Sequence, residues 1–444
     1  MCIFSALIIF LLGIYLSIKT KFLQLKILPK ALLNIFKSLK PDKKTSHGGI
    51  SSTEAMCTAL AATIGTGNVA GISGAIALAG PGVIFWIWVS TLFAMIIKYF
   101  EIYISLIYRN HTKNGYSGGT MYAVKYGLKK AFLPLAYIFA LCGLFASFGT
   151  GNFIQINTVT AAVENLLPSV PNVGIITGII ITFFIGILLL SGIKAVGKVC
   201  EKIVPVMLLL YLLASFGVIF FNLNNLGSAF AAVLKGAFNP AAVTGGVVCS
   251  LILTVRIGVI RGIVSNEAGL GTATLAHAAT QTNDFNGESE FGIAEVFIDT
   301  FICTLTAFVI LLGNKNIVYG YDTGSKLILG SFSNTFGTAA DGILSVFLIL
   351  FGVSSVLGWG AYGITCCSFL SGKKGVTLYK ICFSLACIPA AVLTVDKIWC
   401  ISELLNSVMS IPNVTAIFFL SPKVVEILKK IKFNHLYLKN NVVK

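Results

Sequence analysis

Long apolar runs separated by short polar segments dominate the sequence. Because about 20 apolar residues cross the hydrocarbon core of a bilayer as a helix, this pattern predicts eleven membrane-spanning helices. We place them at residues 2–18, 55–80, 82–108, 131–163, 173–191, 201–222, 241–279, 291–313, 338–370, 377–395 and 398–420. The third, fourth, seventh and ninth are longer than a perpendicular crossing needs, so tilts or breaks are expected there. The expected fold class is an all-α polytopic membrane protein.

The second predicted span contains a segment that should interrupt its helix. Residues 61–71 read AATIGTGNVAG, with three glycines within seven residues beside Thr66 and Asn68. In hydrocarbon, an interrupted backbone is tolerated only where protein or a water-filled cavity satisfies the freed polar groups. Many secondary transporters hold their substrate and ions at such broken helices. Close packing of small residues between neighbouring helices is the alternative interpretation.

The ten spans after the first divide into two halves of five, at residues 55–222 and 241–420. An odd number of spans inverts the second half relative to the first, and broken helices at matching places in inverted halves point to a transport site. The seventh span carries glycines between Arg256 and Gly271. Ser265 is expected to cap a new half-helix there, with Glu267 in its first turn. We therefore expect a 5+5 inverted repeat with two discontinuous helices.

The two ends of the chain lie outside these halves. Residues 1–54 are expected to form an extra transmembrane helix followed by an amphipathic linker, whose segment 21–39 would lie along the cytoplasmic leaflet. Residues 421–444 form a basic tail that we expect in the cytoplasm. The first span has no basic segment before it, and it is interpreted as a retained helix rather than a signal peptide.

Composition and charge placement support a membrane protein. The chain of 444 residues is 56% hydrophobic and 11% charged, with a net charge of +16. Twenty-five of the thirty-two Lys and Arg residues fall in alternate loops, as the positive-inside rule requires. This predicts a protein of the cell membrane, with its N-terminus outside the cell and its C-terminus in the cytoplasm. The placement of the basic residues in alternate loops also argues against nucleic acid as a partner. The Lys-, Ile- and Asn-rich composition is typical of an AT-rich bacterium.

Several segments together resemble the alanine/glycine:cation symporter family. Residues 59–101 are similar to its signature region and residues 258–279 to its second signature, and further matches lie at 151–159, 299–312, 357–363 and 406–414. The resemblance covers nearly the whole chain in order. It implies sodium-coupled, or sometimes proton-coupled, uptake of small neutral amino acids on a leucine-transporter-type fold. One departure is Val264, where the family commonly has an aromatic residue.

The chemistry of an amino-acid zwitterion suggests the substrate-binding residues. A broken helix offers N–H groups to a carboxylate and carbonyl groups to a cation. We expect Thr66 and Gly67 to hold the carboxylate, since glycine lets a ligand approach the backbone closely. The resemblance also favours substrate contact by Gln155, for which interhelical hydrogen bonding is the alternative. Trp359 would form an apolar wall that excludes side chains larger than that of alanine.

Further binding residues are expected in other spans. Ile257 and Gly258 of the seventh span are also placed at the substrate site. By analogy with the cation site of the resembled fold, sodium would be held by Ala61, Ile64, Ser354 and Ser355. Paired serines in a membrane helix are alternatively packing residues. No cofactor is expected beyond sodium as the coupling ion, and the oligomeric state is left open.

Charged residues within the spans need partners, because they are costly in the membrane. We expect a structural or gating ion-pair network among five of them, and direct contact with the ligand is the alternative. The five are Arg256, Arg261, Glu267, Glu295 and Asp299. Lys98 and Glu101 are three residues apart and could pair along their helix. His277 is a candidate for proton coupling or else a packing residue.

Three classes of function compete on this sequence. A symporter for alanine and glycine is favoured over an uncoupled facilitator or channel, because interrupted helices in inverted halves suit alternating access. A proton-coupled carrier is the nearest alternative. The sequence contains no G-x-x-x-x-G-K-[ST] motif of an ATP-driven motor, no H-E-x-x-H motif and no TVGYG-type filter. An intramembrane enzyme is therefore not expected.

Overall fold

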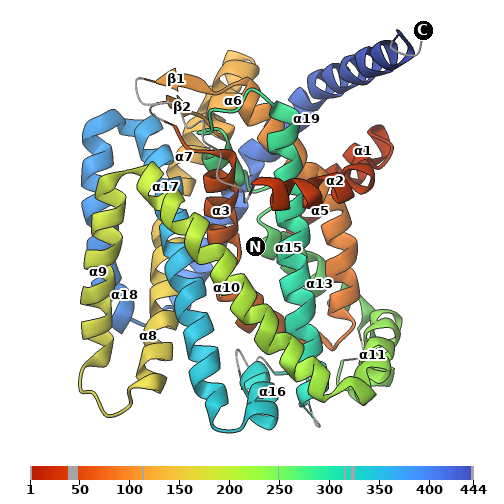
Figure 1. Cartoon of the computed structure of the whole chain (residues 1–444), viewed down its shortest axis with the longest axis vertical. Helices are drawn as coiled ribbons and strands as arrows, with labels where there is room; N and C mark the ends of the chain where they lie inside the picture. Colours follow the sequence, from red (N-terminus) through yellow and green to blue (C-terminus); the bar gives the residue numbers. More distant parts are fainter. Residues whose placement is uncertain are drawn as a thin grey trace.

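The computed structural model describes residues 3–38, 49–112, 115–248, 250–314, 317–321 and 326–441. In these ranges the chain is a bundle of long helices, most of them running the length of the molecule (Figure 1). The strands β1 (Asn110–Thr112) and β2 (Gly115–Ser117) form an antiparallel hairpin beside the end of α5. The all-α fold predicted from the sequence is confirmed.

Seven of the described helices, or nine if each of two bent pairs is one span, are long and apolar enough to cross a membrane. The long elements are α5 (Val83–Ile107), α9 (Val173–Ser191), α10 (Ile193–Phe221), α15 (Phe285–Gly313), α17 (Ala339–Leu385) and α19 (Asp396–Asn441). Gly372, with φ of +64°, bends α17, and the second arm of α17 with α18 (Cys387–Val392) covers the predicted tenth span. Counting these two arms separately brings the number within the described residues to ten, which is close to the eleven crossings expected.

Shorter elements connect these helices at the two ends of the bundle. They are α6 (Thr120–Gly127), η2 (Lys130–Phe132), η4 (Leu223–Asn225), α11 (Leu226–Phe238), α12 (Pro240–Thr244) and α16 (Lys326–Phe336). In Figure 1, α11 and α16 lie at the end of the molecule opposite α2, α6 and the hairpin.

The first two helices turn sharply relative to each other. The axes of α1 (Ile3–Lys19) and α2 (Leu23–Ser38) are 91° apart. Such a bend is what a crossing helix followed by a helix along the membrane surface requires. Lys30 and Asn34 of α2 bind the carboxylate of Glu290 at the start of α15, at 2.7 and 3.0 Å. These contacts hold α2 against the start of α15.

The second predicted span is broken where its glycines are. Helix α3 (Ser52–Thr63) begins with a capping box between Ser51 and Glu54, and it ends at Ile64 in an extended conformation. The chain continues as a π-helical turn, η1 (Gly67–Gly71), and then as α4 (Ile72–Ala79). The two parts are bent by 50°. A Cβ added at Gly65 would lie 2.8 Å from the hydroxyl of Ser355, so a side chain at this position would displace that hydroxyl.

The seventh span is also broken, but later than the sequence suggested. Helix α13 (Leu251–Asn266) is continuous, and the chain leaves the helix only at Glu267 before the short α14 (Ala273–His277). Glu267, Gly269 and Gly271 have φ of 51°, 81° and 82°. The expectation that Ser265 begins a half-helix is therefore wrong, since Ser265 lies inside the last turn of α13.

The earlier glycines of this span, Gly258 and Gly262, allow close helix packing instead of a break. A Cβ added at Gly258 would lie 2.5 Å from Cβ of Trp86, and one at Gly262 would lie 2.0 Å from the hydroxyl of Ser90. Both contacts are with α5, so these glycines allow α13 and α5 to approach closely. A glycine in the sequence is compatible with a helix break and with a close contact between helices. The sequence therefore placed the break of this span too early.

Two charged side chains of α5 satisfy the backbone freed by the second break. The ammonium group of Lys98 donates to the carbonyl of Asn266 at 3.0 Å, at the negative end of the α13 dipole. The carboxylate of Glu101 accepts from the N–H of Gly269 at 3.2 Å and from the amide of Asn413 at 2.8 Å. Within the described residues Lys98 and Glu101 form no ion pair with each other. The expected pairing along α5 is therefore replaced by contacts that support the break.

The fourth span contains a third irregular segment. Between α7 (Leu133–Ala146) and α8 (Ile154–Leu166), the chain forms a seven-residue π-helical segment, η3 (Ser147–Phe153). Segments of this kind are frequent at functional sites. A Cβ added at Gly151 would lie 2.1 Å from Cβ of Trp359, so η3 packs directly against α17.

Candidate functional site

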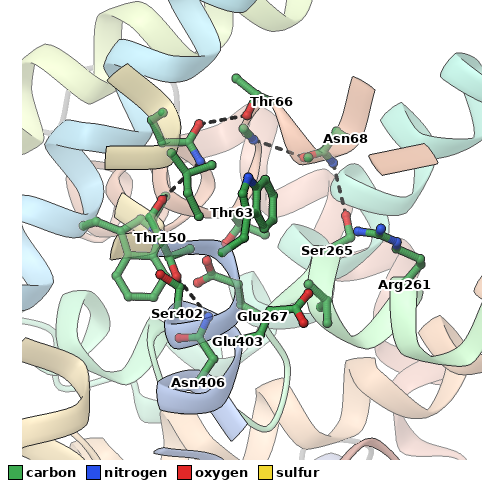
Figure 2. A pocket seen from close by; sticks show the side chains of 18 of the residues that line it. Thr63, Thr66, Asn68, Thr150, Arg261, Ser265, Glu267, Ser402, Glu403 and Asn406 are labelled. Atoms are coloured by element: carbon green, nitrogen blue, oxygen red, sulfur yellow. Dashed lines mark hydrogen bonds between the residues drawn. The ribbon is translucent and has the colours of Figure 1, made fainter. Parts of the chain in front are cut away.

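A cavity of about 110 Å³ lies between the irregular segments. It is lined by the α3–η1 break, by η3 and the start of α8, and by residues of α13, α17 and α19 (Figure 2). An apolar cavity of about 150 Å³ is known to hold benzene, and alanine has as many non-hydrogen atoms as benzene. The cavity therefore has the size for a small solute, and its lining mixes polar and apolar groups.

Four of the six expected substrate residues line this cavity: Thr66, Gly67, Gln155 and Trp359. Gly67 is exposed, and a Cβ added there would meet no atom within 4 Å. The hydroxyl of Thr66 donates to the side-chain oxygen of Gln155 at 3.2 Å, and the amide nitrogen of Gln155 donates to the carbonyl of Thr150 at 3.3 Å. Gln155 thus forms the interhelical hydrogen bond considered for it and also lines the cavity, and its contact with substrate stays a prediction.

Trp359 is 1% exposed and belongs to α17. Its Cβ rests against Gly151 of η3, and its side chain forms part of the cavity wall. Ile257 and Gly258 do not line the cavity, because Gly258 faces α5. The cavity is lined instead by Glu267 at the second break and by three residues of the preceding α13, Arg261, Val264 and Ser265.

The residues expected to hold sodium are only partly brought together. The hydroxyl of Ser355 lies 3.5 Å from the carbonyl of Ile64, at the end of α3. Ser354 points elsewhere, with its hydroxyl bonded to the carbonyl of Phe351 at 3.0 Å and to the sulfur of Met207 at 3.3 Å. Ala61 is fully buried in α3, one turn before Ile64. Ile64 and Ser355 therefore present oxygen atoms to one another beside the break, whereas Ser354 does not.

Asn68 joins the two broken helices, a role that the sequence did not reveal. Its side-chain oxygen accepts from the N–H of Gly65 at 3.1 Å. Its amide nitrogen donates to the carboxylate of Asp299 at 2.6 Å and to the hydroxyl of Ser265 at 3.3 Å. Ser265 also donates to Asp299, at 2.7 Å. The polar character of Asn68 beside three glycines was a signal, but its partners are about 200 residues away in the chain.

Asp299 has no ion-pair partner in the part of the chain that the structure describes. It is fully buried in α15, and its carboxylate oxygens accept hydrogen bonds from Asn68 and Ser265. A buried carboxylate inside a membrane is costly and usually marks a functional place. The negative charge therefore favours a cation in this part of the protein.

The ion-pair network expected among the five charged residues of the seventh and eighth spans does not form. Arg256 is exposed, and Arg261 lines the cavity without an ion pair to any described residue. Glu267 also lines the cavity and accepts from the hydroxyl of Thr272 at 2.6 Å. Glu295 binds His277 instead. The five charges are dispersed because Arg256 and Arg261 lie on α13, Glu267 lies at the break, and Glu295 and Asp299 on α15 contact other partners.

His277 lies in a buried cluster apart from the cavity. Its two ring nitrogens are each 2.7 Å from a carboxylate oxygen, Nδ1 from Glu288 and Nε2 from Glu295. None of the three side chains is among those lining the cavity. The cluster joins the end of the seventh span to α15, and the geometry satisfies both ring nitrogens.

This arrangement defines a class of protein. Interrupted helices that enclose a small cavity within a helical membrane bundle are the architecture of secondary transporters. The solved structure of MhsT in complex with L-phenylalanine is similar, with a TM-score of 0.59 at 13% identity, over 84% of this chain and 90% of that one. A manganese transporter of Eremococcus coleocola gives a TM-score of 0.52 at 14% identity, over 83% and 76%. These likenesses show a leucine-transporter-type fold.

The chain belongs to the sodium:alanine symporter family, whose model matches residues 1–442. It is 38% identical to the sodium/alanine symporter AgcS of Methanococcus maripaludis, over 93% of this chain and 90% of that protein. It is 34% identical to the probable sodium/glutamine symporter GlnT of Bacillus subtilis, over 96% and 88%. The protein is thus a multi-pass membrane transporter and not an enzyme, and the resemblance found in its motifs is confirmed.

Proposed function

We propose that this protein imports small neutral amino acids, chiefly alanine and glycine, together with sodium by alternating access. The observation that carries the proposal is the cavity at the α3–η1 break, where Gly67 presents bare backbone to a space of about 110 Å³. The substrate carboxylate would lie against Thr66 and Gly67, at the N-terminal, positive end of the η1–α4 segment. The similarity to a sodium/alanine symporter supports this substrate class.

The opposite end of the break suits a cation. The carbonyl of Ile64 ends α3, where the helix dipole is negative, and the hydroxyl of Ser355 faces it from α17. Carbonyl and hydroxyl oxygens are the groups that coordinate sodium in transporters with discontinuous helices. The carboxylate of Asp299, which has no ion-pair partner among the described residues and is linked to the break through Asn68, adds negative charge nearby. Sodium would therefore be bound as a co-substrate beside the amino acid.

Uptake of radiolabelled alanine into proteoliposomes tests the proposal when sodium and pH gradients are imposed separately. We expect accumulation with an inward sodium gradient at equal pH on both sides. Accumulation that needs only the pH gradient would show a proton-coupled carrier instead. Equilibration without accumulation under either gradient would show an uncoupled facilitator.

A further inference from the structure

We propose that the carboxylate of Glu267 binds the ammonium group of the substrate and thereby selects amino acids over other small carboxylates. Glu267 directly follows α13 and lines the cavity. Figure 2 shows Glu267 well separated from Thr66, near which we place the carboxylate of the substrate. The inference rests on the proposed function, because it assigns the second charged group of the same amino acid.

The carboxylate of Glu267 has hydrogen-bonding capacity left for a ligand. Glu267 lines the cavity and keeps 6% of its surface exposed, whereas Asp299 is fully buried and does not line the cavity. An ionised carboxylate has sites for about four hydrogen bonds. The hydroxyl of Thr272 uses one of them at 2.6 Å, and the indole of Trp359 is a second hydrogen-bonding neighbour. The remaining sites can accept from the N–H groups of an ammonium.

No cationic side chain of the described chain forms an ion pair with Glu267. Arg261 lines the same cavity but makes no such contact, and the ammonium group of Lys98 donates to the carbonyl of Asn266 at 3.0 Å. Burying a charge is costly unless it is paired. The ammonium group of a bound amino acid would supply the missing partner.

The two charged groups of an amino acid then meet opposite electrostatic environments. The carboxylate would lie at Thr66 and Gly67, at the positive end of the η1–α4 segment, and the ammonium would lie beside Glu267. Since α13 ends at Asn266, its negative dipole end also favours a positive charge at this place. A cavity of about 110 Å³ keeps the two environments close together, as a short zwitterion requires.

A role in ending α13 does not by itself explain a glutamate at this position. Its φ of 51° lies in the left-handed region, where glycine or asparagine usually ends a helix. The hydrogen bond from Thr272 needs only an oxygen acceptor, which glutamine would also provide. The negative charge is therefore the property that a ligand would use, and it can be removed alone by Glu267→Gln.

Equilibrium binding of labelled alanine to the purified full chain in sodium tests the inference, with lactate as the unlabelled competitor. Lactate has the same number of non-hydrogen atoms as alanine and carries a hydroxyl in place of the ammonium group. We expect the wild-type protein to bind alanine at least about tenfold more tightly than lactate, since a hydrogen bond to a charged group is lost. Glu267→Gln should bring the ratio of the two constants toward one. A ratio of one in the wild type, or an unchanged ratio in Glu267→Gln, would overturn the assignment.

Glu403→Gln is the matched control, because Glu403 also lines the cavity but is exposed to solvent, which weakens its electrostatic interactions. Its ratio should equal that of the wild type. Loss of the preference in Glu403→Gln and not in Glu267→Gln would place the ammonium group elsewhere. A higher sodium requirement of Glu267→Gln with an unchanged ratio would show a sodium ligand instead.

A second variant covers the case in which Glu267→Gln does not fold, as judged by thermal unfolding in detergent. Thr272 does not line the cavity, and its hydroxyl holds the carboxylate of Glu267. Thr272→Val should therefore lower the preference for alanine over lactate in part. A preference equal to that of the wild type would contradict the inference.

Failure of the proposed symport would be recognised separately. Alanine binding of equal strength in sodium and in potassium would contradict the symport, and the lactate ratio would still test Glu267. Sodium-dependent binding with a ratio that Glu267→Gln leaves unchanged would contradict only the role of Glu267. Absence of alanine binding would contradict both.

Discussion

Gly67 lies at the start of η1, exposed to the cavity and without any atom within 4 Å of the position of a Cβ. A side chain there would occupy the space in which we place the substrate carboxylate. We expect Gly67→Leu to abolish alanine uptake while the protein still reaches the membrane. Uptake of labelled alanine and the amount of the protein in the membrane fraction measure the two effects. Gly227→Leu is the control, since Gly227 of α11 is equally open but distant from the break. Normal uptake by Gly67→Leu would remove the substrate from this break.

Ser355 and Ser354 are adjacent serines that the structure distinguishes. Only Ser355 faces the carbonyl of Ile64, whereas Ser354 bonds within α17 and to Met207. Ser355→Ala should therefore raise the sodium concentration for half-maximal uptake about tenfold, the loss of one buried oxygen partner. At saturating sodium its alanine affinity should change little. Ser354→Ala should leave the sodium concentration for half-maximal uptake unchanged. A larger increase in that concentration for Ser354→Ala than for Ser355→Ala would refute the cation site.

At the scale of single residues, the sequence predicted those whose chemistry is unusual for a membrane span. Thr66 and Gly67, Gln155 and Trp359 stand out against apolar neighbours, and the structure places all four on one cavity. The partners of Asn68 could not be predicted, because Ser265 and Asp299 are about 200 residues away in the chain and meet it only in the folded structure.

Among the elements, α5 has a role beyond crossing the membrane, since Lys98 and Glu101 hold the backbone of the second break. Removing the charge of Lys98 leaves the carbonyl end of α13 without its donor. Lys98→Met should lower stability by about 1.5–3 kcal/mol, the usual contribution of a hydrogen bond to a charged group. The midpoint of thermal unfolding in detergent measures this. Lys129→Met, at an exposed lysine, should be neutral, and equal midpoints for both variants would contradict the supporting role.

The two breaks show what local sequence can and cannot predict. The first was located correctly because Gly65, Thr66 and Gly67 combine flexible backbone with polar side chains. The second was placed too early because Gly258 and Gly262 look equally permissive, although they pack on α5. The difference depends on a helix about 170 residues away. The true break, from Glu267 onward, requires positive φ at two glycines, and that requirement leaves no separate mark in the sequence.

For the whole molecule, the distribution of basic residues predicts a membrane topology that can be measured. Twenty-five Lys and Arg residues lie in one set of loops, and four lie in the opposite set. Reporter fusions at Lys130 and Lys444 should both indicate the cytoplasm, and a fusion at Asn225 should indicate the outside. An external signal at Lys130 would overturn the assignment of spans and the orientation of both halves.

The overall arrangement also tests the idea of an inverted repeat. The broken α3–α4 and α13–α14 pairs each precede a long helix, α5 and α15, and these two helices pack side by side through hydrogen bonds such as Thr91 to Thr300 at 2.8 Å. Helical periodicity and apolar length were enough to predict the crossings. The pairing of α5 with α15 depends on contacts between distant segments and was not predictable from either alone.

The central claim is that the cavity binds a small neutral amino acid and sodium together. Equilibrium binding of radiolabelled alanine to the purified protein, in sodium and in potassium at equal ionic strength, tests it most directly. We predict saturable binding in sodium that weakens at least tenfold when potassium replaces it, because the cation at Ile64 and Ser355 would no longer stabilise the break beside the carboxylate. Binding of equal strength in both salts would contradict the account.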